Sequence, residues 1–336
     1  MSCDREFRYL AISEAQKYFK MCHASNLLRL KDGNVLTVFF AGTHEGEKDT
    51  AIYSCKALEG ESSAPKLIAR SDEAHWNPVL FLPDESNDNE IVLFFKVGNI
   101  IASWRTMVTR SHDGGISWET PWELVAGDKG GRGPVRNKPI RSSSGAILCP
   151  ASLEDGVWRS FIDISTDELA SLHKSNEIFY MQDGAFSPKN KDIEVSLQSF
   201  AGKGIIQPTL WEDSLGIHAL MRSTFGKIIR ADSIDGGRTF NTPYPIEMPN
   251  NNSGIDAAYL NNKLYLVCNP VNGNWAKRTP IALFSSDDGI RFKEEAVLDS
   301  IDGEFSYPCV RAFKNNLYIS YTYLRKNIVI EKFIIK

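Results

Sequence analysis

Six short segments share one pattern, in which a polar or aromatic pair stands just before a proline or a small residue. They are residues 23–27 (HASNL), 76–80 (WNPVL), 137–140 (NKPI), 206–210 (IQPTL), 255–259 (IDAAY) and 306–310 (SYPCV). The pairs are His23 and Ala24, Trp76 and Asn77, Asn137 and Lys138, Ile206 and Gln207, Ile255 and Asp256, and Ser306 and Tyr307. Side chains of these types can bind a polar ligand and transfer protons. We predict a functional site where the six pairs meet.

A second repeat indicates which elements position these pairs. Residues 111–118 (SHDGGISW), 233–240 (SIDGGRTF) and 285–292 (SSDDGIRF) all read Ser-x-Asp-x-Gly-x-x-aromatic, the turn known as the Asp box. The aspartate can accept hydrogen bonds from the N–H groups of its own turn, and glycine tolerates a positive φ. We therefore predict that Asp113, Asp235 and Asp287 hold hairpins together and take no part in chemistry. Residues 165–167 form a degenerate fourth copy without the glycine.

The Asp boxes recur roughly every 50 to 70 residues, a period typical of β-propeller blades. Short runs rich in β-forming residues lie between turn signals, at 34–40, 91–95, 146–148, 264–267 and 317–321. Only residues 13–19 favour a helix. The sequence thus predicts an all-β, six-bladed propeller that forms one domain over residues 1–336. An N-terminal strand at 7–12 would complete the last blade, which ends at 328–335, so that no sheet edge stays open.

Composition limits the classes of function. The 336 residues carry a net charge of −4, which argues against a nucleic-acid surface. No run of about 18 apolar residues could span a membrane, and the charged N-terminus does not resemble a signal peptide. The six cysteines are scattered without a Cys-x-x-Cys pair, which argues against a zinc or redox site. We predict a cytoplasmic protein without a cofactor, and leave open a structural ion in the channel.

Asp boxes on a six-fold repeat resemble the sialidase (neuraminidase) superfamily of BNR-repeat propellers. The phrases His-Ala-Ser, Gly-Thr-His-Glu-Gly, His-Trp-Asn-Pro and Arg-Asn-Lys-Pro are similar to the predicted-neuraminidase branch near the rhamnosyl-glucuronate lyases. Sialidases hold the substrate carboxylate with three arginines, and use a tyrosine nucleophile assisted by a glutamate, with an aspartate as acid/base. The resemblance implies that Tyr307 is the nucleophile and that Arg222 and Arg278 are the second and third arginines.

Two positions depart from the sialidase pattern. His23 stands where the first arginine is expected, and Gln207 stands where the glutamate that assists the tyrosine is expected. Glutamine cannot accept the tyrosine proton, and an unassisted phenol is a poor nucleophile. The acid/base should lie in the loop at 42–49, which offers His44, Glu45, Glu47 and Asp49 without a unique match.

These departures leave three functions open. The superfamily default is a glycosidase that removes a terminal acidic sugar, sialic acid or a uronate, from a glycan. The alternative is a polysaccharide lyase that acts by β-elimination on a rhamnosyl-glucuronate-type linkage, and a third is a non-catalytic glycan-binding propeller. The predicted partner is an acidic oligosaccharide or glycoconjugate, with no nucleic acid and no membrane.

The remaining candidates have a structural reading beside the functional one. We assign catalysis to Tyr307, His23, His44 and Glu45, although a histidine in an apolar run is usually a satisfied core group. Substrate binding is assigned to the following residues: Arg222, Arg278, Asn77, Arg136, Asn137, Lys138, Gln207, Asp256 and Trp76. Trp76 serves either as packing or as a stacking platform for a sugar, and Asp256 either orients an arginine or caps a turn. No metal ligands are predicted.

Overall fold

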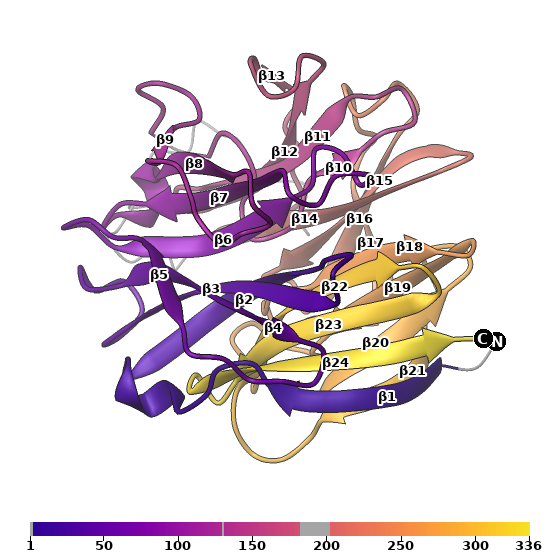
Figure 1. Cartoon of the computed structure of the whole chain (residues 1–336). Helices are drawn as coiled ribbons and strands as arrows, with labels where there is room; N and C mark the ends of the chain where they lie inside the picture. Colours follow the sequence, from indigo (N-terminus) through magenta and orange to yellow (C-terminus); the bar gives the residue numbers. More distant parts are fainter. Residues whose placement is uncertain (1–2, 130, 182–201) are drawn as a thin grey trace.

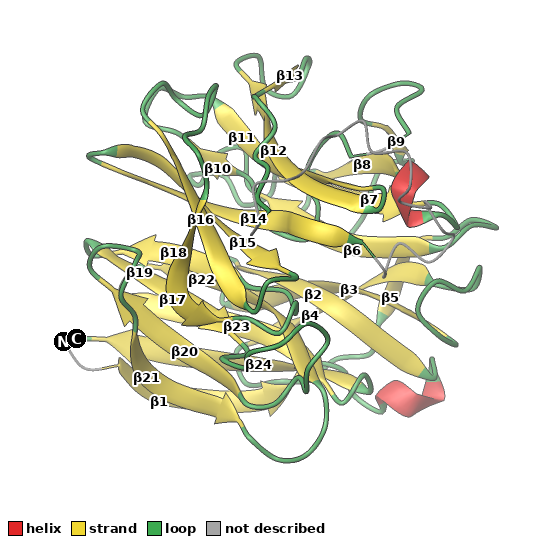
Figure 2. Cartoon of the chain, turned by 180° about the vertical axis from the view of Figure 1, so that it is seen from behind, coloured by secondary structure: helices red, strands yellow, loops and turns green. Residues whose placement is uncertain are grey.

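The computed structural model describes residues 3–129, 131–181 and 202–336. Their regular elements are β-strands, as Figure 2 shows, apart from two single turns of 3₁₀ helix, η1 (Ala15–Lys17) and η2 (Ile101–Ser103). The helix expected over residues 13–19 is reduced to η1, so the prediction of an all-β chain is confirmed.

Four sheets are separate and have four strands each. The first two follow chain order and contain β2 (Met21–Arg29), β3 (Asn34–Gly42), β4 (Ala51–Leu58) and β5 (Lys66–Ala69), then β6 (His75–Phe81), β7 (Ile91–Val97), β8 (Arg105–Ser111) and β9 (Trp122–Glu123). A third contains β18 (Asp256–Leu260), β19 (Lys263–Cys268), β20 (Ile281–Ser286) and β21 (Lys293–Asp299). The fourth has the order β1 (Cys3–Leu10), β24 (Asn327–Ile335), β23 (Asn316–Tyr323) and β22 (Phe305–Phe313).

The strands in the middle of the chain form one larger sheet of eight strands. They are β10 (Ile140–Arg141), β11 (Ile147–Glu154), β12 (Val157–Ser165), β13 (His173–Lys174), β14 (Lys203–Asp213), β15 (Gly216–Ser223), β16 (Lys227–Ser233) and β17 (Tyr244–Pro249). The sheet is continuous because β12 and β14 pair in parallel, Val157 with Lys203 and Trp158 with Gly204. The expectation of six separate blades is therefore corrected: four blades stand alone, and the other strands share hydrogen bonds.

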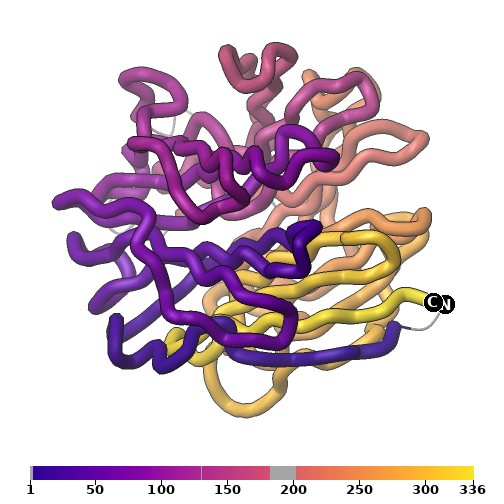
Figure 3. The backbone as a smooth tube through the Cα atoms, viewed as in Figure 1, coloured from indigo at the N-terminus to yellow at the C-terminus, as the bar shows by residue number. Residues whose placement is uncertain are grey.

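The first and last strands lie side by side. β1 pairs antiparallel with β24 from Cys3↔Ile335 to Leu10↔Val329. Figures 1 and 3 show the indigo and yellow segments next to each other, with both ends of the chain at the same place. The outer strand of this sheet thus comes from the opposite end of the chain to its three companions.

Apolar side chains of neighbouring sheets form the core. Leu36 and Phe40 of β3, for example, belong to one buried cluster with Leu80 of β6 and Phe95 of β7. Strands of valine, isoleucine, leucine and phenylalanine suit such packing because both faces of the inner strands are covered. β6 and β7 are buried along their whole length.

Four strands, β2, β6, β14 and β22, carry a bulge at the predicted site. The pairing register shifts at Ala24, Asn77, Gln207 and Tyr307, and each of these residues has a positive φ between 45° and 56°. A bulge redirects a side chain relative to the regular alternation of a strand. Non-glycine residues with a positive φ store strain, which occurs preferentially at functional sites. The proline pattern seen in the sequence therefore marks a local distortion of the backbone.

The Asp boxes hold their turns as expected in two of the three clear copies. Asp113 Oδ1 accepts hydrogen bonds from the N–H groups of Ile116 and Ser117, at 3.0 and 2.8 Å. Asp235 accepts the equivalent bonds from Arg238 and Thr239. Burial would raise the pKa of both aspartates, but their hydrogen bonds within the turn together outweigh it and lower the pKa of each to about 2.

The third copy is corrected by one residue. Asp288, not Asp287, accepts the N–H groups of Ile290 and Arg291, both at 2.8 Å. Asp287 is exposed and pairs with Lys263 at 2.5 Å. The degenerate copy also works, because Asp167 accepts from Ser171 N at 2.9 Å while neighbouring residues adopt a positive φ without glycine.

Candidate functional site

A cavity lies where the bulged segments of β6, β14 and β22 meet. Its lining comprises Glu45, Trp76, Asn77, Ile101, Trp104, Glu154, Trp158, Ile206, Gln207, Arg222, Trp275, Arg278, Tyr307 and Arg325. A second, larger cavity is lined by the other ends of the same strands, such as Phe81 of β6 and Arg311 of β22. The cavity thus brings together seven residues that were predicted from the sequence: Glu45, Trp76, Asn77, Gln207, Arg222, Arg278 and Tyr307.

Tyr307 lies at the centre of a group of cations. The guanidinium carbons of Arg136, Arg222 and Arg278 lie 5.2, 5.6 and 5.6 Å from the centroid of its ring. Arg222 Nη1 donates to the Tyr307 hydroxyl at 3.0 Å. Gly254 backs the ring so closely that a Cβ there would lie 3.4 Å from two ring carbons. The surrounding positive charge stabilises any negative charge that develops on the phenolic oxygen.

A row of alternating charges forms one wall. Arg325 Nη1 donates to Glu45 at 2.6 Å, and Arg325 Nε donates to Glu304 at 2.8 Å. The other Glu304 oxygen accepts from Arg278 Nη1 at 2.7 Å. Burial would raise the pKa of Glu304, but the charges of Arg278 and Arg325 outweigh it and lower that pKa to about 2. Glu304 therefore fixes both arginines in place as an anion.

In another part of the lining, neutral and cationic hydrogen-bond donors connect the side chains to one another. Arg222, buried and anchored on Asn252, also donates from Nη1 to Gln207 Oε1 at 3.1 Å. Gln207 Nε2 in turn donates to Glu154 Oε1 at 3.1 Å, and Ser152 Oγ donates to the same oxygen at 3.0 Å. Burial raises the pKa of Glu154 above its usual value, more than the charge of Arg222 lowers it.

His23 lies behind Tyr307 and does not line the cavity. Its ring centroid is 4.2 Å from that of Tyr307, and Nδ1 lies 2.9 Å from Thr322 Oγ1. Nε2 is buried and has no hydrogen-bond partner among the described residues. Burial and then the charges of Arg325, Arg278, Arg136 and Arg222 hold the pKa of His23 well below its ordinary value. His23 is therefore a neutral imidazole.

Other predicted residues lie elsewhere. Lys138 Nζ is bound to both carboxylate oxygens of Asp256 at 2.8 Å, and Asp256 also accepts from Thr209 Oγ1 and Val310 N. This buried pair leaves neither charge free for a ligand. His44 lines a neighbouring cavity, and its Nδ1 lies 2.6 Å from the Thr43 carbonyl oxygen.

Arg136 and Asn137 support the site from below. Arg136 donates to the Pro308 carbonyl oxygen and to Asn137 Oδ1, and Asn137 Nδ2 donates to the carbonyl oxygen of Gln207 at 2.9 Å. Both residues are buried, and neither lines the cavity. They fix the backbone of the two bulges that carry Tyr307 and Gln207.

Several residues of the cavity were missed by sequence reasoning. They are Glu154, Arg325 and three tryptophans, Trp104, Trp158 and Trp275. Arg325 lies in the turn between β23 and β24, and Glu154 ends β11. The only signal for Arg325 is the basic Leu-Arg-Lys turn at 324–326, and for Glu154 the Ser-Leu-Glu that ends an apolar run.

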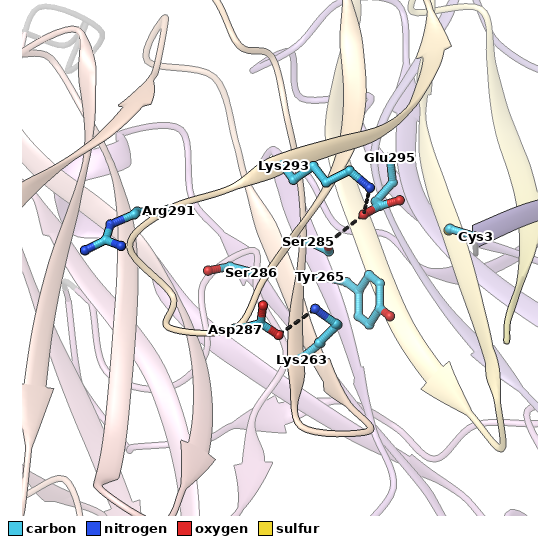
Figure 4. Close-up of a pocket in the computed structure, with 9 residues that line it drawn as sticks. All are labelled: Cys3, Lys263, Tyr265, Ser285, Ser286, Asp287, Arg291, Lys293 and Glu295. Atoms are coloured by element: carbon cyan, nitrogen blue, oxygen red, sulfur yellow. Dashed lines mark hydrogen bonds and ion pairs between the residues drawn. The ribbon is translucent and has the colours of Figure 1, made fainter. Parts of the chain in front are cut away.

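Another pocket lies away from the strand starts, beside the third Asp box. Figure 4 shows that four of its charged side chains form two pairs, while Arg291 points away from them. Lys263 binds Asp287 at 2.5 Å, and Glu295 accepts from Ser285 at 2.8 Å and pairs with Lys293 at 3.3 Å. Because these charges neutralise one another, we do not consider this pocket the functional site.

The described residues contain no group of three or more histidine, cysteine, aspartate or glutamate side chains that could hold a metal ion. In the same part of the chain, no helix is long and apolar enough to cross a membrane.

Comparison with solved structures identifies the fold as that of the sialidases. A protein of unknown function from Dyadobacter fermentans DSM 18053 superposes with a TM-score of 0.75 at 16% identity, with all of both chains covered. The Hadza microbial sialidase Hz136 gives 0.74 at 13% identity, over 97% of this chain and 68% of that one. Trypanosoma rangeli sialidase in complex with 2,3-difluorosialic acid superposes with a TM-score of 0.71 at 13% identity, over 93% of this chain and 54% of that one. This chain thus spans about half the length of the trypanosomal enzyme.

Residues 33–319 match the BNR repeat-like domain family, and the chain belongs to that family. The predicted resemblance to the BNR propellers of the sialidase superfamily is thereby confirmed. No curated protein matches the chain in sequence.

Proposed function

We propose that the protein cleaves a terminal acidic sugar from a glycan in the cavity around Tyr307. The observation that carries this proposal is the convergence of Arg222, Arg278 and Arg325 on one cavity that also contains a tyrosine hydroxyl. Arginine forks bind carboxylates in a bidentate manner, which suits an anionic sugar. Arg325 takes the place of the first arginine that the sequence lacks at His23.

The tryptophans support a sugar rather than a small inorganic anion. Trp76, Trp104, Trp158 and Trp275 line the same cavity, and the rings of Trp76 and Trp104 lie 5.2 Å apart. Flat aromatic faces pack against the apolar faces of pyranose rings while indole N–H groups bond to hydroxyls. Hydrolysis with Tyr307 as nucleophile is the first candidate reaction.

β-Elimination from a uronate is the second candidate, and it is favoured by the replacement of two sialidase residues by Gln207 and His23. In this reaction the arginines neutralise the sugar carboxylate, and the Tyr307 phenolate removes the C5 proton. The C5–H electron pair forms the C4–C5 double bond, and the C4–O bond breaks with its electrons going to the leaving oxygen. That oxygen takes a proton from the Tyr307 phenol, which regenerates the phenolate.

The test measures both reactions on one set of substrates. The full chain is incubated with 4-methylumbelliferyl α-sialoside, 4-methylumbelliferyl glucuronide and an oligosaccharide ending in a rhamnosyl-glucuronate linkage. Hydrolysis releases the fluorophore or a new reducing end, and elimination adds an ultraviolet-absorbing conjugated double bond. Binding of these sugars without either product would contradict the proposal and leave a glycan-binding propeller.

A further inference from the structure

The two carboxylates that line the cavity have different surroundings. Glu45 is ion-paired with Arg325 at 2.6 Å. Glu154 has no ion pair among the described residues and is held by the neutral donors Gln207 and Ser152. A carboxylate without a bound cation can change its protonation state more readily than a paired one.

The two bonds to Glu154 reach the same oxygen. Oε1 accepts from Gln207 Nε2 and from Ser152 Oγ, and no described residue bonds to Oε2. Glu154 lines the cavity and is only partly buried. The side chain is thus oriented by one oxygen and presents the other to a ligand.

Gln207 connects this carboxylate with the tyrosine. Its amide N–H donates to Glu154, while its amide oxygen and the Tyr307 hydroxyl both accept from Arg222 Nη1. A glutamine can make this pair of contacts, one as donor and one as acceptor, whereas a glutamate at 207 would face Glu154 with a second negative charge.

We propose that Glu154 is the proton-accepting carboxylate of the site, displaced from position 207 to position 154, and that Gln207 positions it. The inference rests on the proposed function. In hydrolysis, the Tyr307 oxygen forms a bond to the anomeric carbon as the glycosidic bond breaks. The phenolic proton passes to Glu154 across water, and the leaving oxygen takes a proton from a water molecule. The resulting hydroxide attacks the anomeric carbon, the bond to the Tyr307 oxygen breaks, and that oxygen takes its proton back from Glu154. In elimination, the same transfer to Glu154 supplies the phenolate that removes the C5 proton.

Its surroundings suit this role. The charged groups that act on Glu154 are Arg222 on β15 and Lys96 on β7, with Gln207 on β14 and Ser152 on β11 as hydrogen-bond donors. Burial raises the pKa of Glu154, which brings a carboxylate closer to the pH at which it can accept a proton efficiently. Burial also lowers the pKa of Lys96 to about 8.

The test is a carboxylate exchange between the two positions. E154Q should lower kcat by about 100-fold or more with little change in KM, because general-base contributions are of that order. It should also remove the rise of activity with pH that accompanies deprotonation of Glu154. Q207E should lower kcat similarly, because two adjacent carboxylates retain a proton between them. The double variant E154Q/Q207E restores one carboxylate and one amide and should be at least about tenfold more active than either single variant.

Asp155→Asn is the matched control, because Asp155 follows Glu154 in the chain but pairs with Arg159 and does not line the cavity. Its kcat should stay within a few-fold of the unaltered protein, and thermal unfolding of all variants checks that they fold. E154Q with unchanged kcat and pH profile would overturn this inference but not the proposed function. A double variant no more active than E154Q would have the same consequence. An unaltered protein that converts neither type of substrate would overturn the proposed function as well.

Discussion

Tyr307 is held by contacts that distinguish its hydroxyl from its ring. Arg222 donates to the oxygen at 3.0 Å, while His23 and Gly254 pack on the ring. Loss of the hydroxyl should therefore remove chemistry and leave the packing intact.

Tyr307→Phe should reduce turnover by at least about 1,000-fold, since covalent or proton-transfer catalysis by the oxygen is lost. Binding should persist, because the arginines and tryptophans remain. The measurement pairs kcat with quenching of tryptophan fluorescence by the sugar. Retained turnover would remove Tyr307 from the chemistry.

Arg325 is the residue on which the completed arginine set depends. Arg325→Gln should raise KM for the acidic sugar by about 10- to 100-fold, because a charge-assisted contact to a carboxylate is lost. Lys326→Gln, in the same turn, is the control, since the only bond of the Lys326 side chain among the described residues is to the Lys20 carbonyl oxygen. Equal KM values for the two variants would exclude Arg325 from substrate binding.

The sequence predicts some of these residues and not others for a physical reason. Tyr307 and Gln207 belong to strand starts with a repeated local pattern, so their convergence follows from the repeat. Arg325 and Glu154 lie at a hairpin turn and a strand end, where charged residues are usually solvated. Only the three-dimensional packing of different blades brings them to the cavity.

At the scale of elements, the hairpin staples depend on one aspartate each. Asp288 accepts two backbone N–H groups and the Ser286 hydroxyl, whereas Asp287 makes a surface ion pair. The repeat could be predicted from the sequence, but the register of the third copy could not, because two aspartates stand side by side and only the turn geometry selects one.

The adjacent aspartates provide a matched pair of variants. Asp288→Ala should lower the free energy of unfolding by roughly 1–3 kcal/mol, since several N–H groups of the turn lose their acceptor. Asp287→Ala should change it by less than about 1 kcal/mol, the usual value of an exposed ion pair. Urea unfolding measures the free energy of unfolding of both variants. An equal loss in the two would contradict the assignment of Asp288, rather than Asp287, as the aspartate that holds the turn. Activity should be unchanged in both variants.

At the scale of the whole molecule, the contact between β1 and β24 joins the two ends of the chain. This contact includes an ion pair with a buried carboxylate: Glu331 of β24 is buried, and Arg5 Nε lies 2.7 Å from its carboxylate. The predicted single domain over residues 1–336 stays a prediction, but these contacts explain how the last sheet obtains its fourth strand.

Deletion of residues 1–10 should lower the free energy of unfolding by more than about 3 kcal/mol, because Glu331 loses its cationic partners. It should also promote aggregation, since the edge of β24 becomes free. The variant Arg5→Gln/Arg8→Gln keeps the strand and removes only the charges. Urea unfolding and light scattering then separate the two effects: aggregation should follow the deletion alone. A deletion as stable and soluble as the full chain would contradict this account.

The pairing of β1 with β24 also sets an order in time. Synthesis of 336 residues takes roughly 15 to 70 s at about 5–20 residues per second. β1 is made before the other strands of its sheet and β24 is made after them, so β1 waits without its partner while the strands between them are synthesised. During that interval its charged residues Asp4, Arg5, Glu6 and Arg8 discourage pairing with other exposed strands. The last blade is thus completed only after β24 has been made.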